Sequence, residues 1–314
     1  MQNAHRGRGR VLSRASMQAM LTPQAEVSGG DYREQMGLGA FLLQRADRRD
    51  SVSRYFEHTG VNAGFVAYLL GSVAGGNGVV VMMNNDNGAS ELGKEIRRAV
   101  ARVYNWPGWL LPAVRPVAVP AATLAAYAGR YRRGPDEVLR LRRLGNLLVE
   151  NINDGPDILA VPVGGDTLAF TDFPLRAHFE RDAAGQLTGL RMVGAAAAYP
   201  RLPTTELLPG ELLRAGRIAE AVAGYRALHL GESQLTYMAY ELLNRRPRPD
   251  LPAAEGLLTL AREQFPQSGL VQARWGDLYA RRGNKALAAE AYRAALRQNP
   301  GDKDLQQKLA EALR

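Results

Sequence analysis

Residues 55–65 read YFEHTGVNAGF and residues 78–85 read GVVVMMNN, and these two stretches decide the fold of the first third of the chain. Both are rich in β-branched or apolar residues and adjoin turns that contain glycine, which is typical of strands. The second stretch is apolar almost throughout, as expected for a strand covered on both faces. Together they predict one antiparallel sheet that contains residues 54–58, 65–70 and 79–85.

A helix is expected to follow this sheet and to pack on it. Ser90 opens the segment from Glu91 to Tyr104. Apolar residues recur in this segment at helical spacing, and they are Leu92, Ile96, Val100 and Val103. The pattern predicts strands followed by a packed terminal helix.

Two further elements are expected ahead of this sheet. Ser13 is placed as the N-cap of a short helix that stops before Pro23. One face of this helix is apolar and consists of Met17, Met20 and Leu21. Residues 36–43 indicate a strand, and residues 47–50 indicate a polar turn.

A proline-spaced linker leads into a β-rich middle region. Pro112, Pro116 and Pro120 recur every four residues. The region up to Leu202 then contains short strand candidates separated by turn residues, at 138–142, 147–150, 159–163, 167–170, 177–181 and 187–192. This spacing predicts an antiparallel meander or a small barrel.

The last 110 residues are helical and repetitive in pattern. Several residues between 269 and 302 fall at the offsets of the tetratricopeptide pattern, namely Trp275, Gly276, Tyr279, Gly283, Ala288, Tyr292, Ala295 and Pro300. Weaker copies before them predict three helical hairpins, at about 204–230, 233–266 and 268–299. We expect Tyr279, Ala288 and Tyr292 to be buried within the third hairpin. A capping helix is expected at 302–314, with Leu305, Leu309 and Leu313 on one stripe.

Composition excludes several classes of function. The chain has no cysteine, which rules out disulfides, thiolate catalysis and cysteine-bound zinc. The net charge of +9 comes almost entirely from arginine, and only Arg6, Arg8 and Arg10 form a tight basic cluster, so no nucleic-acid partner is expected. We also expect no cofactor, no metal, no signal peptide in this chain and no membrane span, which leaves localisation open.

The two opening stretches resemble the closing strands of the beta-lactamase-related serine hydrolases, a group that includes class C beta-lactamases, esterases and D-aminopeptidases. Residues 9–13 and 36–39 also match the approach to these strands in that group. The resemblance covers residues 1–108. It implies catalysis by a Ser-x-x-Lys pair, a Tyr-x-Asn or Ser-x-Asn element, and a Lys-Thr-Gly or His-x-Gly element on an edge strand.

His58-Thr59-Gly60 corresponds to the third of these elements. The resemblance implies that the strand with His58 lines the site beside the nucleophile, and that the backbone N–H of Val61 is one oxyanion-hole donor. Gly60 has no side chain, which lets a substrate carbonyl approach closely. The alternative reading is an ordinary histidine between a strand and a turn.

The other two elements are missing from the sequence. No serine is followed three residues later by lysine, because the nearest case, Ser90 and Lys94, is four apart. No Tyr-x-Asn occurs either. We therefore expect the first domain to be incomplete, with its nucleophile encoded upstream of Met1, and the chain alone to be inactive. The alternative function is a non-catalytic interaction protein that uses its helical repeats.

The middle region has a resemblance of its own. Tyr127-x-Gly-x-Tyr131, with residues 179–182 and 185–190, is similar to a lipocalin-like domain of unknown function that often follows beta-lactamase-related domains. We expect a packed accessory domain, with a small-ligand barrel as the alternative.

The fold expected is therefore multidomain α+β. It consists of a partial beta-lactamase-like sheet with a terminal helix at 1–108, a small β domain at 109–203 and helical repeats at 204–314. The repeats either bind a peptide or protein partner or pack internally. A small-molecule substrate is expected only in a complete parent protein.

Overall fold

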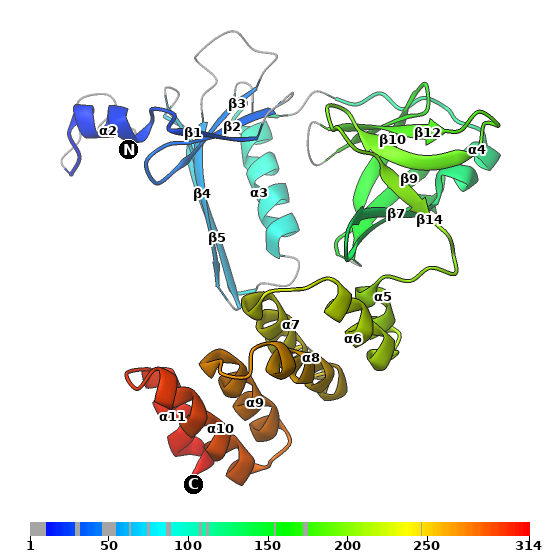
Figure 1. Cartoon of the computed structure of the whole chain (residues 1–314). Coiled ribbons are helices and arrows are strands. Elements are labelled where there is room, and N and C mark those ends of the chain that lie inside the picture. Colours follow the sequence, from blue (N-terminus) through cyan, green and yellow to red (C-terminus); the bar gives the residue numbers. More distant parts are fainter. Residues whose placement is uncertain are drawn as a thin grey trace. The chain divides into compact units, whose positions relative to one another are not determined.

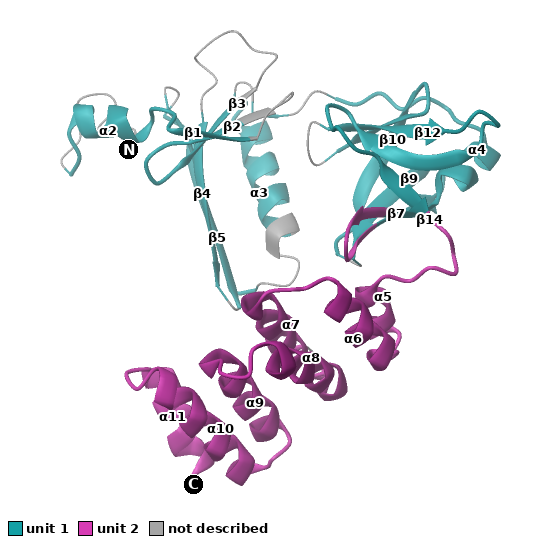
Figure 2. Cartoon of the chain, in the orientation of Figure 1, with its two compact units in different colours: residues 1–131, 139–201 teal, residues 132–138, 202–314 magenta. Residues whose placement is uncertain are grey.

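The computed structural model of the 314-residue chain describes residues 11–28, 32–45, 55–62, 64–73, 76–85, 89–106, 109–110, 113–153, 155–171, 175–245 and 247–314. They form a mixed α+β chain with two antiparallel sheets, one of them closed into a barrel, and a series of helices (Figure 1). The chain divides into two compact units (Figure 2). Unit 1 comprises residues 1–131 and 139–201, and unit 2 comprises residues 132–138 and 202–314.

The open sheet of unit 1 is an antiparallel meander in which each strand pairs with the next in the chain. Its strands are β1 (Ala25–Ser28), β2 (Tyr32–Met36), β3 (Phe41–Arg45), β4 (Tyr55–Asn62), β5 (Phe65–Ser72) and β6 (Gly78–Met83). β4, β5 and β6 confirm the predicted pairing, although β6 ends at Met83 rather than at residue 85 and residue 54 lies outside the described residues.

Helix α3 (Ala89–Val103) packs on one face of this sheet, as predicted. Its Ile96 contacts the cluster formed by Val66, Tyr68 and Val81, and Ala101 packs with Leu70. Gly93 permits a close approach, because a Cβ at this position would lie 2.3 Å from the ring of Tyr68. The sheet face that contacts α3 is therefore closed by a helix along β5 and β6.

Among the described residues, helix α2 (Arg14–Met20) covers the opposite face, at one end only. The Ser13 side chain caps α2 by accepting a 3.0 Å hydrogen bond from the backbone N–H of Ser16, as predicted. Met17 is fully buried and packs with Leu42 and Phe56. The helix thus anchors the end of the sheet where β3 and the start of β4 lie side by side.

The predicted strand at 36–43 is wrong in its extent. The chain turns between Met36 and Phe41, so that β2 ends and β3 begins within this run. Gly39 adopts a positive φ of 77°, a conformation that favours glycine and ends an extended run. β1 was not predicted at all. The turn expected at 47–50 lies outside the described residues.

The barrel follows the short helix α4 (Ala121–Tyr127) and closes completely. Its strands are β7 (Gly129–Gly134), β8 (Glu137–Leu144), β9 (Leu147–Ile152), β10 (Ile158–Gly164), β11 (Thr167–Phe170), β12 (Arg176–Arg181), β13 (Leu187–Met192) and β14 (Tyr199–Leu202). The six predicted strand candidates are confirmed, and β7 and β14 were not predicted. Apolar side chains fill the interior, among them Tyr131, Leu141, Leu148, Leu168, Phe170 and Leu190.

Unit 2 is built largely from helices that form successive hairpins. They are α5 (Pro209–Arg214), α6 (Ile218–Ala227), α7 (Glu232–Asn244), α8 (Leu251–Gln264), α9 (Gly269–Arg281), α10 (Lys285–Gln298) and α11 (Lys303–Ala312). The predicted burial of Ala288 and Tyr292 is confirmed, whereas Tyr279 is only partly buried because it lies near the end of α9. Leu313 follows the end of α11 and is exposed, so the predicted apolar stripe ends at Leu309.

In the described part of the chain, no helix has the length and apolar character needed to cross a membrane.

Candidate functional site

The strand that carries His58, Thr59, Gly60 and Val61 has two different ends. β5 pairs with β4 along its whole length, from Tyr55 to Asn62. β3 pairs only with the first three residues of β4, through Phe41, Leu42 and Leu43. Among the described residues, no strand pairs with the other edge of β4 from His58 onward. The predicted motif therefore lies on an edge, although β4 as a whole is an internal strand of the sheet.

The register decides which face His58 and Gly60 occupy. His58 lies opposite Leu69 on β5, and Leu69 lies opposite Val80 on β6. Directly opposed residues of antiparallel strands place their side chains on the same face. Leu69 and Val80 are exposed, whereas their neighbours Tyr68 and Val81 are buried towards α3. His58 and Gly60 thus belong to the sheet face that α3 does not cover.

The space beside the motif is open. His58 is exposed, and a Cβ built on Gly60 would meet no atom within 4 Å. Val61 is 65% exposed. Gly60 therefore leaves room above the strand, and a ligand at this place stays a prediction.

Sequence reasoning missed an ion pair directly behind this motif. The Arg97 Nη1 of α3 donates a 2.8 Å hydrogen bond to the carboxylate of Glu57, the residue before His58. The same guanidinium lies 4.3 Å from the ring centre of Tyr68. Burial raises the pKa of Glu57 above 4.5, and the positive charge of Arg97 opposes that rise. The predicted apolar stripe of α3 did not point to this pair, because Leu92 and Val103 of that stripe are exposed and the helix instead buries Arg97.

The structure does not bring the remaining sequence candidates to this place. Lys94 lies on α3, which packs on the face opposite His58. His178 belongs to the barrel, where its Nδ1 lies 2.7 Å from the Oγ1 of Thr167. Nothing in the described residues therefore pairs a nucleophile with a base beside His58. No group of metal-ligating side chains large enough to hold an ion occurs in the described residues either.

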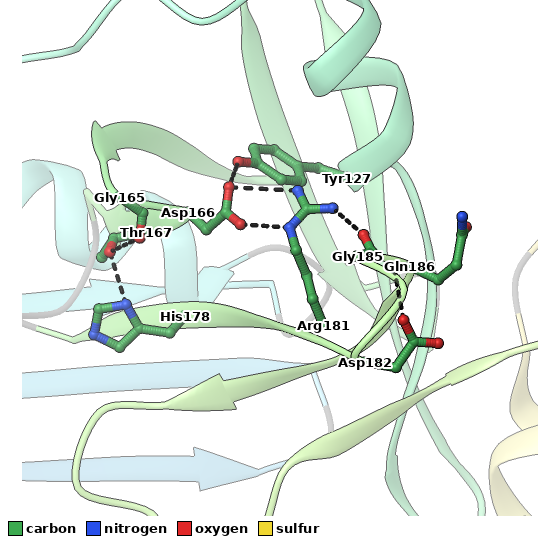
Figure 3. A network of polar contacts seen from close by, with 9 residues as sticks. All are labelled: Tyr127, Gly165, Asp166, Thr167, His178, Arg181, Asp182, Gly185 and Gln186. Carbon is green, nitrogen blue, oxygen red and sulfur yellow. Dashed lines mark hydrogen bonds and ion pairs between the residues drawn. The ribbon is translucent and has the colours of Figure 1, made fainter.

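A second cluster unites the residues that were singled out in the middle region (Figure 3). The Tyr127 hydroxyl donates to Asp166, and the Nε of Arg181 donates to the same carboxylate at 2.6 Å. The Tyr127 ring stacks on Phe179 with centroids 3.9 Å apart. The Tyr131 hydroxyl donates a 2.7 Å hydrogen bond to the carbonyl of Tyr127.

The charges of this cluster are satisfied from within. Hydrogen bonds from Arg181 and Tyr127 lower the pKa of Asp166 below 3.8. Burial, together with the bond to Asp166, raises the pKa of Tyr127 to about 12. Arg181 also donates to the carbonyl of Gly185 at 2.9 Å. The cluster therefore fastens the end of α4 to the β10–β11 and β12–β13 turns, and its residue pattern has a structural explanation.

Comparison with known proteins gives little beyond this geometry. No protein-family model matches the chain, and no curated protein matches it. Solved structures with a distant likeness include SurE with D-Leu, at 18% identity and a TM-score of 0.29, covering 61% of this chain and 44% of that one. A second SurE structure has 18% identity and a TM-score of 0.30, with 61% and 42% covered.

A third is the octameric penicillin-binding protein homologue from Pyrococcus abyssi, at 14% identity and a TM-score of 0.32. The match spans 62% of this chain and 44% of that protein. The chain thus spans less than half the length of these proteins. Scores of this size describe a distant structural likeness only.

Proposed function

We propose that residues 1–108 are the closing part of a beta-lactamase-related serine hydrolase domain, followed by an accessory barrel at 109–203 and tetratricopeptide-like repeats at 204–314. In this proposal, β4 supplies one wall of an acyl-transfer site. The observation that carries it is the half-paired strand: the motif begins at His58, where β3 pairing stops, and lies on the exposed sheet face. A substrate wall needs this combination of a free backbone edge and open space above it.

The chemistry also requires groups that the chain lacks. Acyl transfer begins when a hydroxyl attacks a carbonyl carbon while a neighbouring base takes its proton. A backbone donor such as the N–H of Val61 stabilises the negative charge that develops on the carbonyl oxygen. Such a donor cannot replace the attacking atom, and no Ser-x-x-Lys occurs anywhere in the 314 residues. The chain alone is therefore expected to be inactive.

The first test is covalent labelling. Intact-mass spectrometry after incubation with a fluorophosphonate or a beta-lactam should show no adduct on the 314-residue chain. A version extended at its N-terminus by a segment with Ser-x-x-Lys and Tyr-x-Asn should gain one adduct. A stoichiometric adduct on any serine of the short chain, abolished by replacing that serine and by His58→Ala, contradicts the proposal.

A matched variant tests the wall itself. Gly60→Val adds a side chain where the described structure has open space, so the fold should be retained. In the extended protein this substitution should block substrate approach and prevent acylation. Gly301→Val serves as a matched control, because a Cβ at Gly301 also meets no atom within 4 Å. Acylation of the extended Gly60→Val protein at an unchanged rate means that β4 does not line the site.

A second candidate function is a protein-interaction module in unit 2. The observation that favours it is a group of two tyrosines and one arginine on α7 and α9, in which Arg274 also pairs with Asp277 at 2.9 Å. Tyr237, exposed by 60%, lies beside Tyr240 with ring centroids 6.5 Å apart, and the Arg274 guanidinium lies 4.6 Å from the Tyr240 ring centre. Tyrosine and arginine are enriched where proteins bind partners. Affinity enrichment with quantitative mass spectrometry should then find a protein whose binding depends on Tyr237 and not on Gly60.

A further inference from the structure

The buried line of α3 is unusual, because its one large side chain is charged. In the part of this helix whose burial is described, three residues are buried, and they are Gly93, Arg97 and Ala101, spaced four apart. An amphipathic helix normally buries large apolar side chains along such a line. Here glycine and alanine lie on either side of an arginine that is only 8% exposed. The orientation of α3 on the sheet therefore depends on what the guanidinium of Arg97 binds.

Three contacts hold this guanidinium. Its Nη1 donates a 2.8 Å hydrogen bond to Glu57 of β4, and its Nε donates to the carbonyl of Gly93 at 3.3 Å. Its carbon atom lies 4.3 Å from the ring centre of Tyr68 of β5. The side chains of Arg97 and Glu57 are 10% and 18% exposed, so water screens the pair little. One side chain of α3 thus binds two neighbouring strands of the sheet.

Glu57 lies where the pairing of β4 changes. It is the last residue of β4 that pairs with β3, through Phe41. The next residue, His58, begins the part of β4 that pairs only with β5 among the described strands. Arg97 therefore contacts β4 directly before its half-paired part begins.

A buried ion pair at this place calls for a reason other than stability. Removing two charges from water costs free energy that their attraction offsets only in part, and apolar residues of similar size often serve as well. Burial is the largest influence on Glu57 and raises its pKa, although Arg97 opposes the rise. A charged hydrogen bond differs from an apolar contact because it fixes a distance and an angle. The pair is thus better suited to setting a geometry than to adding stability.

We propose that Arg97 is a positioning residue for the half-paired part of β4. Its hydrogen bond to Glu57 fixes the direction in which the strand continues, and hence the orientation of His58 and of the backbone N–H of Val61. The ordering of this edge stands on the contacts of Arg97 alone. Its consequence for catalysis rests on the proposed function, in which the N–H of Val61 stabilises a developing charge and must be held in place beforehand.

Hydrogen exchange in the full 314-residue chain tests the ordering of the edge. The variant carries Glu57→Leu and Arg97→Met together, an apolar pair that should keep the fold and its free energy of unfolding. Amides of residues 58–62 should exchange about tenfold faster, because their strand has lost its directional contact with α3. Exchange in β6 and in the barrel should stay unchanged. Peptide-level mass spectrometry measures each segment, and urea unfolding measures the global stability.

Arg102→Met is the matched control. Arg102 lies on the same helix but is exposed, so the same substitution there should leave exchange in residues 58–62 unchanged. Arg97→Lys is a second variant that keeps the charge but lacks the rigid fork of donors. It should raise exchange in the same segment by a smaller factor, and it decides the question if the apolar pair does not fold.

The extended protein tests the consequence for catalysis. With the apolar pair, the acylation rate at saturating probe should fall roughly tenfold, less than the loss of a whole oxyanion donor causes. The probe concentration that gives half of this rate should stay unchanged, because Arg97 does not touch the substrate. If the extended protein with no substitution is not acylated, the proposed function fails alone, and hydrogen exchange in the 314-residue chain still decides the role of Arg97.

Three results overturn the proposal. The first is unchanged exchange in residues 58–62 of a folded variant with the apolar pair. The second is exchange that rises equally in residues 58–62, in β6 and in the barrel, since this shows a general role in stability. The third is a higher half-maximal probe concentration at an unchanged acylation rate, since a displaced donor lowers the rate.

Discussion

At the scale of single residues, the polar contacts of Asp166 give a turn of the barrel a clear structural role. Asp166 adopts a positive φ of 53° in the turn between β10 and β11, and its carboxylate accepts hydrogen bonds from two other elements. A non-glycine residue holds this conformation when surrounding contacts favour it. The carboxylate therefore connects a strained turn to α4 through Tyr127.

The first prediction follows from the lowered pKa of Asp166. A carboxyl group whose pKa is lower in the folded protein than in the unfolded chain stabilises the fold at pH values above the unfolded-state pKa. This stabilisation is lost as the pH falls through the folded-state pKa. Asp166→Asn should therefore lower the free energy of unfolding near neutral pH. The difference in the free energy of unfolding between this variant and the unmodified protein should become smaller as the pH falls below 3.8. Urea unfolding followed by circular dichroism at several pH values measures it.

Tyr127→Phe provides the companion variant, because it removes one of the two donors to Asp166. Its effect and that of Asp166→Asn should not add in the double variant, since both break the same network. Strict additivity, or a gap that stays constant with pH, contradicts this account of the cluster.

At the scale of elements, close helix packing in unit 2 depends on small residues. Ala288 of α10 is fully buried, and Gly276 of α9 lies so close to Tyr292 that a Cβ there would come within 2.4 Å of its ring. The Tyr292 hydroxyl in turn donates a 3.0 Å hydrogen bond to Asp277. Small residues on one helix and an aromatic ring on the other therefore set the spacing of this hairpin.

The second prediction is that Ala288→Trp disrupts the α9–α10 hairpin by overpacking. The cost should be on the order of 1–3 kcal/mol or more in the free energy of unfolding. Leu287→Trp, one residue away on the same helix and 39% exposed in the original, serves as the control and should cost little. Chemical denaturation of both variants compares them. Equal effects from the two substitutions count against the tetratricopeptide reading of this unit.

The elements that sequence predicted correctly share a strong local pattern. β6 was evident from GVVVMM, α3 from its apolar spacing and α2 from Ser13 before an apolar face. The errors arose where tertiary context decides. β1 has only the sequence AEVS and forms because β2 pairs with it, and the half-paired state of β4 depends on where β3 diverges. Contacts between distant residues, such as Glu57 with Arg97, leave no periodic signal.

At the scale of the whole molecule, the open sheet has one well-covered face and one that is largely bare. α2 covers the region of Phe56, while Phe65, Leu69, Val80 and Met82 remain exposed among the described residues. Contiguous exposed apolar surface of this kind marks an interaction site or a tendency to aggregate.

The third prediction therefore concerns residues 1–108 expressed alone. This fragment should associate or precipitate, because the exposed apolar face of its sheet favours association with other apolar surfaces. Sedimentation after expression, compared with the full chain and with a Val80→Lys version of the fragment, measures the effect. A monomeric fragment that unfolds in one cooperative transition counts against an incomplete first domain.

The turn between β7 and β8 has a consequence for how such a chain can be taken apart. Residues 132–138 belong to the helical unit, and the Asp136 carboxylate accepts a 2.6 Å hydrogen bond from the N–H of Gly210, at the start of α5, and one of 2.8 Å from the hydroxyl of Tyr225. Tyr225 is almost fully buried. If recombination or engineering separates the chain at residue 204, the Tyr225 hydroxyl and the N–H of Gly210 lose Asp136 as their acceptor. The helical unit is therefore discontinuous in sequence. To keep all of its hydrogen bonds, the helices must be transferred together with residues 132–138 of the β7–β8 hairpin.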